Sequence, residues 1–182
     1  MQKLIFLELN EINFEYVEYY TQKGLLKNFK KIIDTHGCSE TTSEKNYDEL
    51  EPWIQWPSVR TGLSYSEHGI FRLGDIVDSN IKQHWEKIEN HGYSVAAVSP
   101  INAVNRTKNS PFWISDPWTD TVTSGSKFVK RLTKAIGQVV NDNVKKKISF
   151  ESKITLIEAV LSCARGKDIG RYLTLISNAV FD

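Results

Sequence analysis

The chain has 182 residues and a formal net charge of +1; 40% of its residues are hydrophobic and 25% are charged. This composition is typical of a globular domain with a sizeable core, and a charge so close to zero gives no overall field to favour nucleic acid or an anionic membrane. No secretory signal and no apolar stretch of roughly 18 residues, the length of a membrane span, is visible. Because Cys38 and Cys163 have no metal-ligand spacing, we expect free thiols in a cytoplasmic protein.

The first hundred residues have the pattern of alternating strands and helices. The apolar run over 3–9 predicts a buried first strand. In chain order, the patterns then predict helices over 14–20 and 25–34, a short strand over 36–43, a polar loop over 44–51, a short helix from Pro57 to Gly62, a tight turn over 66–70, a helix over 79–90 with Ser79 as its N-cap, and a buried strand over 93–99. A strand, a crossover helix and a second strand form a parallel sheet, so the predicted fold class is α/β, three-layer α/β/α with a mainly parallel sheet.

The remaining residues are predicted to be a loop followed by helices. The segment 100–123 is rich in loop residues, as in active-site loops at the carboxyl edge of a sheet. Helices are predicted over 126–142, 150–164 and 167–180. We therefore divide the chain into an α/β core over 1–123 and a helical segment over 124–182, an insertion or cap of a longer protein. Uncovered apolar faces on these helices predict self-association.

Four segments of the α/β part carry motifs in a defined order. They are the strand over 4–10, the helix over 26–32 followed by Gly37, the segment 61–70 (Thr-Gly-Leu-Ser-Tyr-Ser-Glu-His-Gly-Ile), and a helix-Gly-Tyr-strand unit over 85–95. In this order they resemble the alkaline-phosphatase-like superfamily, which includes type I phosphodiesterases, nucleotide pyrophosphatases and sulfatases. The segment 61–70 is similar to the family's Thr-Gly-Leu-x-Pro-x-x-His-Gly-Ile, which follows the nucleophile helix. The resemblance implies a metal-dependent hydrolase or transferase for a small phosphate or sulfate ester, with 1–123 as a partial family core.

The chain departs from the family pattern at two places. The family's nucleophile lies nine residues before the Thr of Thr-Gly, and Pro52 occupies that position here; the nearest hydroxyl, that of Ser58, is in another register. The family's later Asp and His ligands also have no counterpart, since no histidine follows His91. The resemblance therefore implies an incomplete or degenerate copy, inactive on its own. Two alternatives remain open: a non-catalytic α/β fragment that binds an anionic ligand or a protein partner, and a nucleotide-sugar-dependent transferase.

Candidate site residues follow from these positions. Ligands bind beyond the carboxyl ends of parallel strands, where the first predicted strand is followed by polar residues. The resemblance assigns Glu8, or else Glu11, as a ligand of a divalent metal, most simply zinc, in place of the family's Asp; solvated strand-exit residues are the alternative. The remaining candidates are Ser58 as nucleophile, Gln55, Arg60 and Asn10 as substrate-binding residues, and His68 as a residue that shapes its turn. Asp116 and Asp120 either reach a substrate or form a turn.

Overall fold

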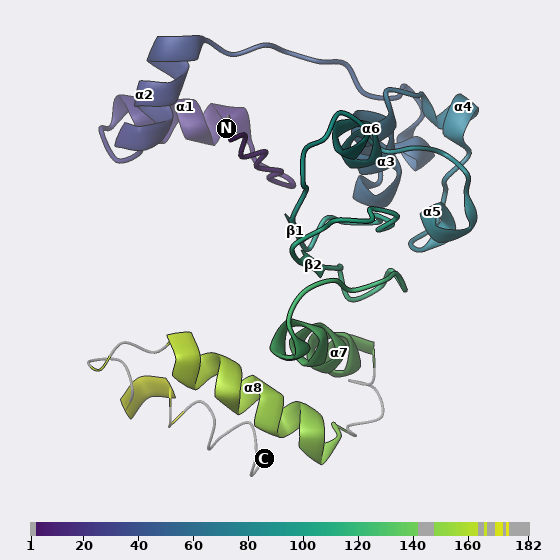
Figure 1. The fold of residues 1–182 in the computed structure, drawn as a ribbon. Coiled ribbons are helices and arrows are strands. Elements are labelled where there is room, and N and C mark those ends of the chain that lie inside the picture. The colour runs from purple at the N-terminus through teal and green to yellow at the C-terminus, as the bar shows by residue number, and fades with distance from the viewer. Residues whose placement is uncertain (1–2, 142–147, 164–165, 167–169, 173, 175–182) are drawn as a thin grey trace. The chain divides into compact units, whose positions relative to one another are not determined.

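A computed structural model describes residues 3–141, 148–163, 166, 170–172 and 174, and the chain divides into two compact units, 1–45 and 46–182. The elements, labelled in Figure 1, are α1 (Phe14–Gln22), α2 (Lys27–His36), the 3-10 helix η1 (Tyr47–Glu49), α3 (Pro52–Thr61), α4 (Tyr65–His68), α5 (Asp75–Asp78), α6 (His84–Asn90), β1 (Ala97–Val98), β2 (Trp113–Ile114), α7 (Lys127–Asn141) and α8 (Phe150–Cys163). The helix predicted over 167–180 falls mainly outside the described residues.

The prediction of a three-layer α/β/α fold is wrong, because the structure is mostly helical. Its sheet has two strands, β1 and β2, which pair in parallel with Ala97 opposite Trp113. Of the strand predicted over 93–99 only β1 forms, and neither 3–9 nor 36–43 forms a strand. Strand 3–9 was predicted to be buried, yet Leu4 is 81% exposed and Ile5 90%. An apolar run becomes a strand only when neighbouring strands satisfy its backbone and cover its side chains.

The first unit is a pair of helices, and both were predicted from the sequence. The side chain of Asn13 caps α1, because Oδ1 accepts hydrogen bonds from the backbone N–H groups of Glu15 and Tyr16 at 2.8 and 3.2 Å. Helix α1 contacts α2 and buries Val17. Helix α2 ends at Gly37, which adopts a φ of +76° that favours glycine.

Two apolar clusters form the core of the second unit. The first joins Ile70, Ile76 and Val104. The second contains Trp85 from α6, Trp113 from β2 and Ala103, and the two indole rings meet edge to face with centroids 5.0 Å apart. These clusters tie the loop 100–105 to both α6 and the short sheet.

Two helix starts in this unit differ from the predictions. Ser79 was predicted to cap a helix over 79–90, but it follows the end of α5, and α6 begins only at His84. Gln83 is the N-cap of α6, and its backbone N–H donates to the Glu86 carboxylate at 2.9 Å in a capping box. Helix α3 begins at Pro52 instead of Pro57, so Pro57 lies inside it. Proline suits the first helical position, where its missing N–H removes no hydrogen bond.

Helices α7 and α8 lie side by side (Figure 1). Small side chains form their contact, with Ala135 of α7 and Ser152 and Thr155 of α8 buried. Arg131 Nη2 lies 2.7 Å from Glu158 Oε2 across the pair. Ser149 caps α8 through a 3.2 Å bond that its Oγ accepts from the N–H of Ser152. The helices predicted over 126–142 and 150–164 are confirmed as α7 and α8, and residues 142 and 164 lie outside the described residues.

Candidate functional site

Ser58, the predicted nucleophile, lies in α3 and contacts His68 of α4. Ser58 Oγ is 2.9 Å from His68 Nε2, with Ser58 half-buried and His68 buried. Gly62 follows α3 with a left-handed φ of +76° and turns the chain, so that α4 returns against α3. A serine nucleophile is usually activated by a base at hydrogen-bond distance, and His68 lies where a general base for Ser58 would lie.

The hydrogen bond on the other ring nitrogen of His68 assigns its tautomer. The backbone N–H of Ile70 donates to His68 Nδ1 at 2.9 Å, so Nδ1 accepts and carries no proton. In a neutral imidazole the proton then resides on Nε2, which donates to Ser58 Oγ. A ring nitrogen that donates a proton to the hydroxyl oxygen cannot remove the hydroxyl proton. In this tautomer the pair is a clasp between α3 and the turn after it.

A second hydrogen-bonded group holds α4 from its other end. The Ser64 hydroxyl donates to Glu67 Oε2 at 2.7 Å and its backbone N–H donates to the same oxygen at 2.8 Å. These bonds from Ser64, the hydroxyl's first, hold the pKa of Glu67 below its ordinary value. The segment with the most specific resemblance is thus a tightly bonded turn.

Asn102, which the sequence analysis did not single out, joins three parts of this unit. Its Nδ2 donates to the Trp53 carbonyl at 2.7 Å and to the Arg72 carbonyl at 3.1 Å, and its Oδ1 accepts from the Gly74 N–H at 2.9 Å. In an unbroken helix the Trp53 carbonyl would accept from the residue four places on, but Pro57 has no N–H. Asn102 therefore satisfies the carbonyl that the proline leaves open.

Arg60 and Gln55, two predicted substrate-binding residues, form contacts within the second unit. The guanidinium of Arg60 is buried, donates to the Ile101 carbonyl, and lies 5.4 and 5.5 Å from the ring centroids of Trp56 and Trp85. Gln55 Nε2 donates to the carbonyl of Glu49 at 2.6 Å. Both contacts organise the scaffold around α3, and a role in substrate binding stays a prediction.

Glu8, Asn10 and Glu11 belong to the first unit, whereas Gln55, Ser58 and Arg60 belong to the second. Glu8 is half-buried, Asn10 and Glu11 are exposed, and Glu11 has a φ of +55°. Among the described residues, no three His, Cys, Asp or Glu side chains gather to hold a metal ion. The donor set in this part of the chain does not fit the tetrahedral zinc site that the resemblance implies. Zinc at Glu8 or Glu11 stays a prediction.

Asp116 forms a turn, one of the two roles expected for it. Its Oδ1 accepts from the N–H groups of Trp118 and Thr119 at 2.8 and 3.0 Å, and its Oδ2 accepts from the Asn102 N–H at 3.0 Å. The buried carboxylate is thus occupied by backbone donors, while Asp120 is exposed. Asp116 connects the loop after β2 to Asn102.

Comparison with known proteins gave no match to any family model, curated protein or solved structure. Helices of the described segments are all too short or too polar to cross a membrane. The family resemblance of segment 61–70 therefore stays a prediction. The Ser58–His68 contact could have been suspected from the sequence, because Gly62 and Gly69 mark the ends of two consecutive helices. Asn102 gave no such signal, since its φ of +49° and its three partners depend on distant residues.

Proposed function

We propose that the chain is part of a metal-dependent hydrolase or transferase that acts on a phosphate or sulfate ester, and that on its own it is an incomplete copy without turnover. The chemical class rests on the resemblance of segment 61–70. The contact between Ser58 Oγ and His68 Nε2 at 2.9 Å carries the second part of the proposal. It ties the hydroxyl nearest the expected nucleophile position to the histidine of that segment.

The hydrogen-bond directions explain why turnover would need further groups. The Ile70 N–H occupies Nδ1 of His68, and the proton on Nε2 points to Ser58. An alcohol is a weak nucleophile until a base or a metal ion removes its proton. His68 does not act as that base in this tautomer, so activation would come from groups outside those described.

The experiment is an ester assay on the 182-residue chain. Bis(p-nitrophenyl) phosphate and p-nitrophenyl sulfate are offered with and without added zinc. The expected rate equals the rate of zinc in buffer, and Ser58→Ala leaves it unchanged. Ser66→Ala, at an exposed serine on α4, is the control. A rate above buffer that is lost in Ser58→Ala but kept in Ser66→Ala would identify Ser58 as a nucleophile and contradict the proposal that the chain alone has no turnover.

Anion binding tests the ester class separately from turnover. We expect inorganic phosphate, titrated to about 10 mM, to shift NMR resonances of the predicted substrate-binding residues Asn10, Gln55 or Arg60, as a millimolar site would. Sodium chloride at matched ionic strength is the control. Shifts that are equal in both salts would contradict an anionic ester as the substrate.

A further inference from the structure

Helix α8 has two opposite faces of different character. On its inner face, the side that faces α7, Ser152 and Thr155 are buried, and the neighbouring Leu156 and Val160 are half-buried. Its outer stripe consists of Phe150, Ile154, Ile157 and Leu161. At 100° per residue, the centre of this stripe lies nearly opposite the inner face. Phe150 is 78% exposed, Ile154 45% and Leu161 50%, whereas Ile157 is half-buried, so three of the four members of the outer stripe are open to solvent.

The outer stripe has the spacing of a coiled-coil seam. Successive members are four, three and four residues apart, which places Phe150 and Ile157 at d positions and Ile154 and Leu161 at a positions. Such a seam spans the whole of α8, whereas a helix that only covers its own core carries its apolar residues on the inner side.

The two edges of the stripe carry opposite charge. Glu151 and Glu158 occupy the e positions along one edge, and Lys153 occupies a g position on the other. In a parallel pair of helices, a g residue faces the e residue five positions later on the partner. Lys153 would then face the partner's Glu158, and the same pair would recur by symmetry. In an antiparallel pair, e faces e and g faces g, which brings like charges together.

We propose that the outer stripe of α8 binds a second copy of this chain, with the two α8 helices parallel and Lys153 paired with the partner's Glu158. This dimer is independent of the proposed function. A second copy is the partner that the charges favour, because Lys153 on one edge and Glu158 on the other face each other when the stripe pairs with itself in this orientation.

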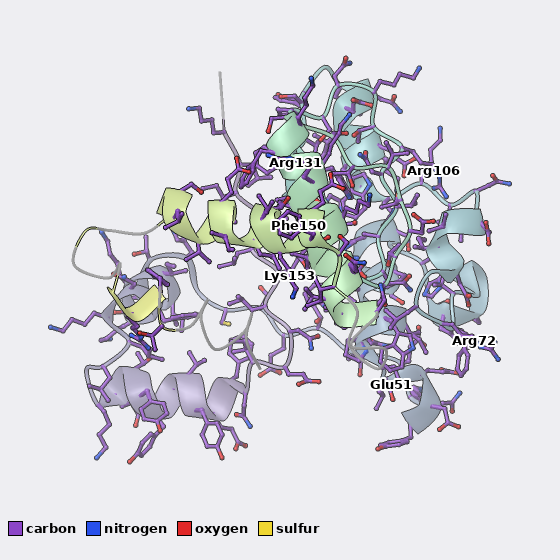
Figure 2. All side chains as sticks on the ribbon, turned by 90° about the horizontal axis from the view of Figure 1, so that it is seen from below. Glu51, Arg72, Arg106, Arg131, Phe150 and Lys153 are labelled. Atoms are coloured by element: carbon purple, nitrogen blue, oxygen red, sulfur yellow. The ribbon has the colours of Figure 1, made fainter. Side chains whose placement is uncertain are left out.

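The contact between α7 and α8 leaves these groups in place for pairing. Figure 2 labels Phe150 and Lys153 on α8 and Arg131 on α7. Glu158 Oε2 pairs with Arg131, and the carboxylate is still 47% exposed, with a second oxygen to accept another cation. Lys153 has no ion-pair partner among the described side chains. Since the seam covers two heptads, the association should be weak, with a dissociation constant of about 10–500 μM.

Sedimentation equilibrium of the 182-residue chain from about 5 μM to about 1 mM, a range that brackets this constant, tests the proposal. We expect a concentration-dependent monomer–dimer equilibrium. Ile154→Ser should weaken it at least about tenfold. Val122→Ser is the matched control, because Val122 is 70% exposed but lies outside α8. A monomer at every concentration, or equal effects of the two variants, would overturn the proposal.

Charge reversal tests the orientation. The charge-reversal variants at Lys153 and Glu158 are measured in an Arg131→Gln background, which removes the ion pair between Arg131 and Glu158 within one chain. Lys153→Glu should weaken the dimer about tenfold, because two attractive pairs become repulsive, and the double variant Lys153→Glu, Glu158→Lys should restore it. Added salt should reduce both effects. In an antiparallel dimer Lys153→Glu only exchanges one like-charge pair for another, so an unchanged constant would refute the parallel arrangement. Circular dichroism confirms that each variant keeps its helices.

Discussion

Asn102 shows how one side chain can hold a unit that has little regular structure. Its φ of +49° is in the left-handed region, which asparagine adopts more readily than most residues. It is fully buried, and its amide bonds to Trp53, Arg72 and Gly74. Removing the amide would leave the Trp53 carbonyl and the Gly74 N–H without this partner, whereas the Arg72 carbonyl would keep the Asp75 N–H at 3.2 Å. A buried backbone group left without a partner costs about 1–3 kcal/mol.

Substitutions at Asn102 separate the hydrogen bonds from the backbone conformation. We expect Asn102→Gly to lower the free energy of unfolding by about 2–3 kcal/mol, because the side-chain hydrogen bonds are lost. Asn102→Ala should lose about 1 kcal/mol more, since alanine resists the left-handed region and glycine does not. Urea denaturation followed by tryptophan fluorescence measures both. Free energies of unfolding within about 0.5 kcal/mol of that of the natural protein would contradict this role of Asn102.

The residues around Ser58 illustrate what could be predicted at this scale. The resemblance predicts that His68 shapes its turn, and the hydrogen bond from the Ile70 N–H to Nδ1 lies in that turn. The partner of Nε2 was not predicted. Ser58 lies ten residues away, and the contact requires both the end of α3 at Gly62 and the start of α4 at Tyr65.

Glu89 links the end of α6 to the loop at 108–109. Its carboxylate accepts the Lys108 N–H at 2.9 Å and the Asn109 N–H at 2.7 Å. These bonds, that of Lys108 first, hold the pKa of Glu89 below its ordinary value of 4.5. A carboxyl group with a lowered pKa in the folded chain contributes stability above its unfolded pKa and loses it as the pH falls through the folded pKa.

The stability difference between Glu89→Gln and the natural protein should therefore depend on pH. At pH 7 the variant is expected to unfold at lower urea concentration, because it lacks the charged acceptor for two backbone donors. Below the ordinary value of 4.5 the difference should shrink, since Glu89 of the unfolded chain binds a proton first and the folded carboxylate does so only at lower pH. Glu51→Gln is the control, because no hydrogen bond to the Glu51 carboxylate occurs among the described residues. A difference that stays constant from pH 7 to about pH 3 would be evidence against this assignment.

Helices were predicted well and strands poorly, for a physical reason. Helices α1, α2, α7 and α8 satisfy their backbone within one segment, so periodicity and caps in the local sequence suffice to locate them. A strand depends on partners elsewhere in the chain. The apolar run over 3–9 has the composition of a strand but forms none in the described part of the chain, and 93–99 forms a strand only over β1.

The chain divides into two compact units, and the boundary along the sequence lies between Lys45 and Asn46. Residues 37–43 carry no helix or strand and are exposed. The five tryptophans all lie in the second unit. The boundary at 123–124, predicted from the change to consecutive helices, stays a prediction about a longer protein. The compact units of the structure divide the chain earlier, between Lys45 and Asn46.

Limited proteolysis tests this division. We expect trypsin to cleave first at Lys45, because exposed non-helical segments between compact units are cut most readily. The product that begins at Asn46 should keep the tryptophan emission of the whole chain. Mass spectrometry identifies the site. A first cut within 52–141, or a red-shifted emission after cleavage at Lys45, would contradict two independent units.

The protonation of His68 is the most direct test of the account of Ser58. Long-range ¹H–¹⁵N correlation spectra of the ¹⁵N-labelled chain, recorded near pH 8, distinguish the two neutral tautomers of each histidine. We expect a proton on Nε2 of His68 and none on Nδ1, and Ser58→Ala should leave this tautomer unchanged because the Ile70 N–H sets it. A proton on Nδ1, with an unprotonated Nε2 facing Ser58, would instead give the serine a general base. That result would contradict the assignment of His68 as a donor that only connects α3 to the turn after it.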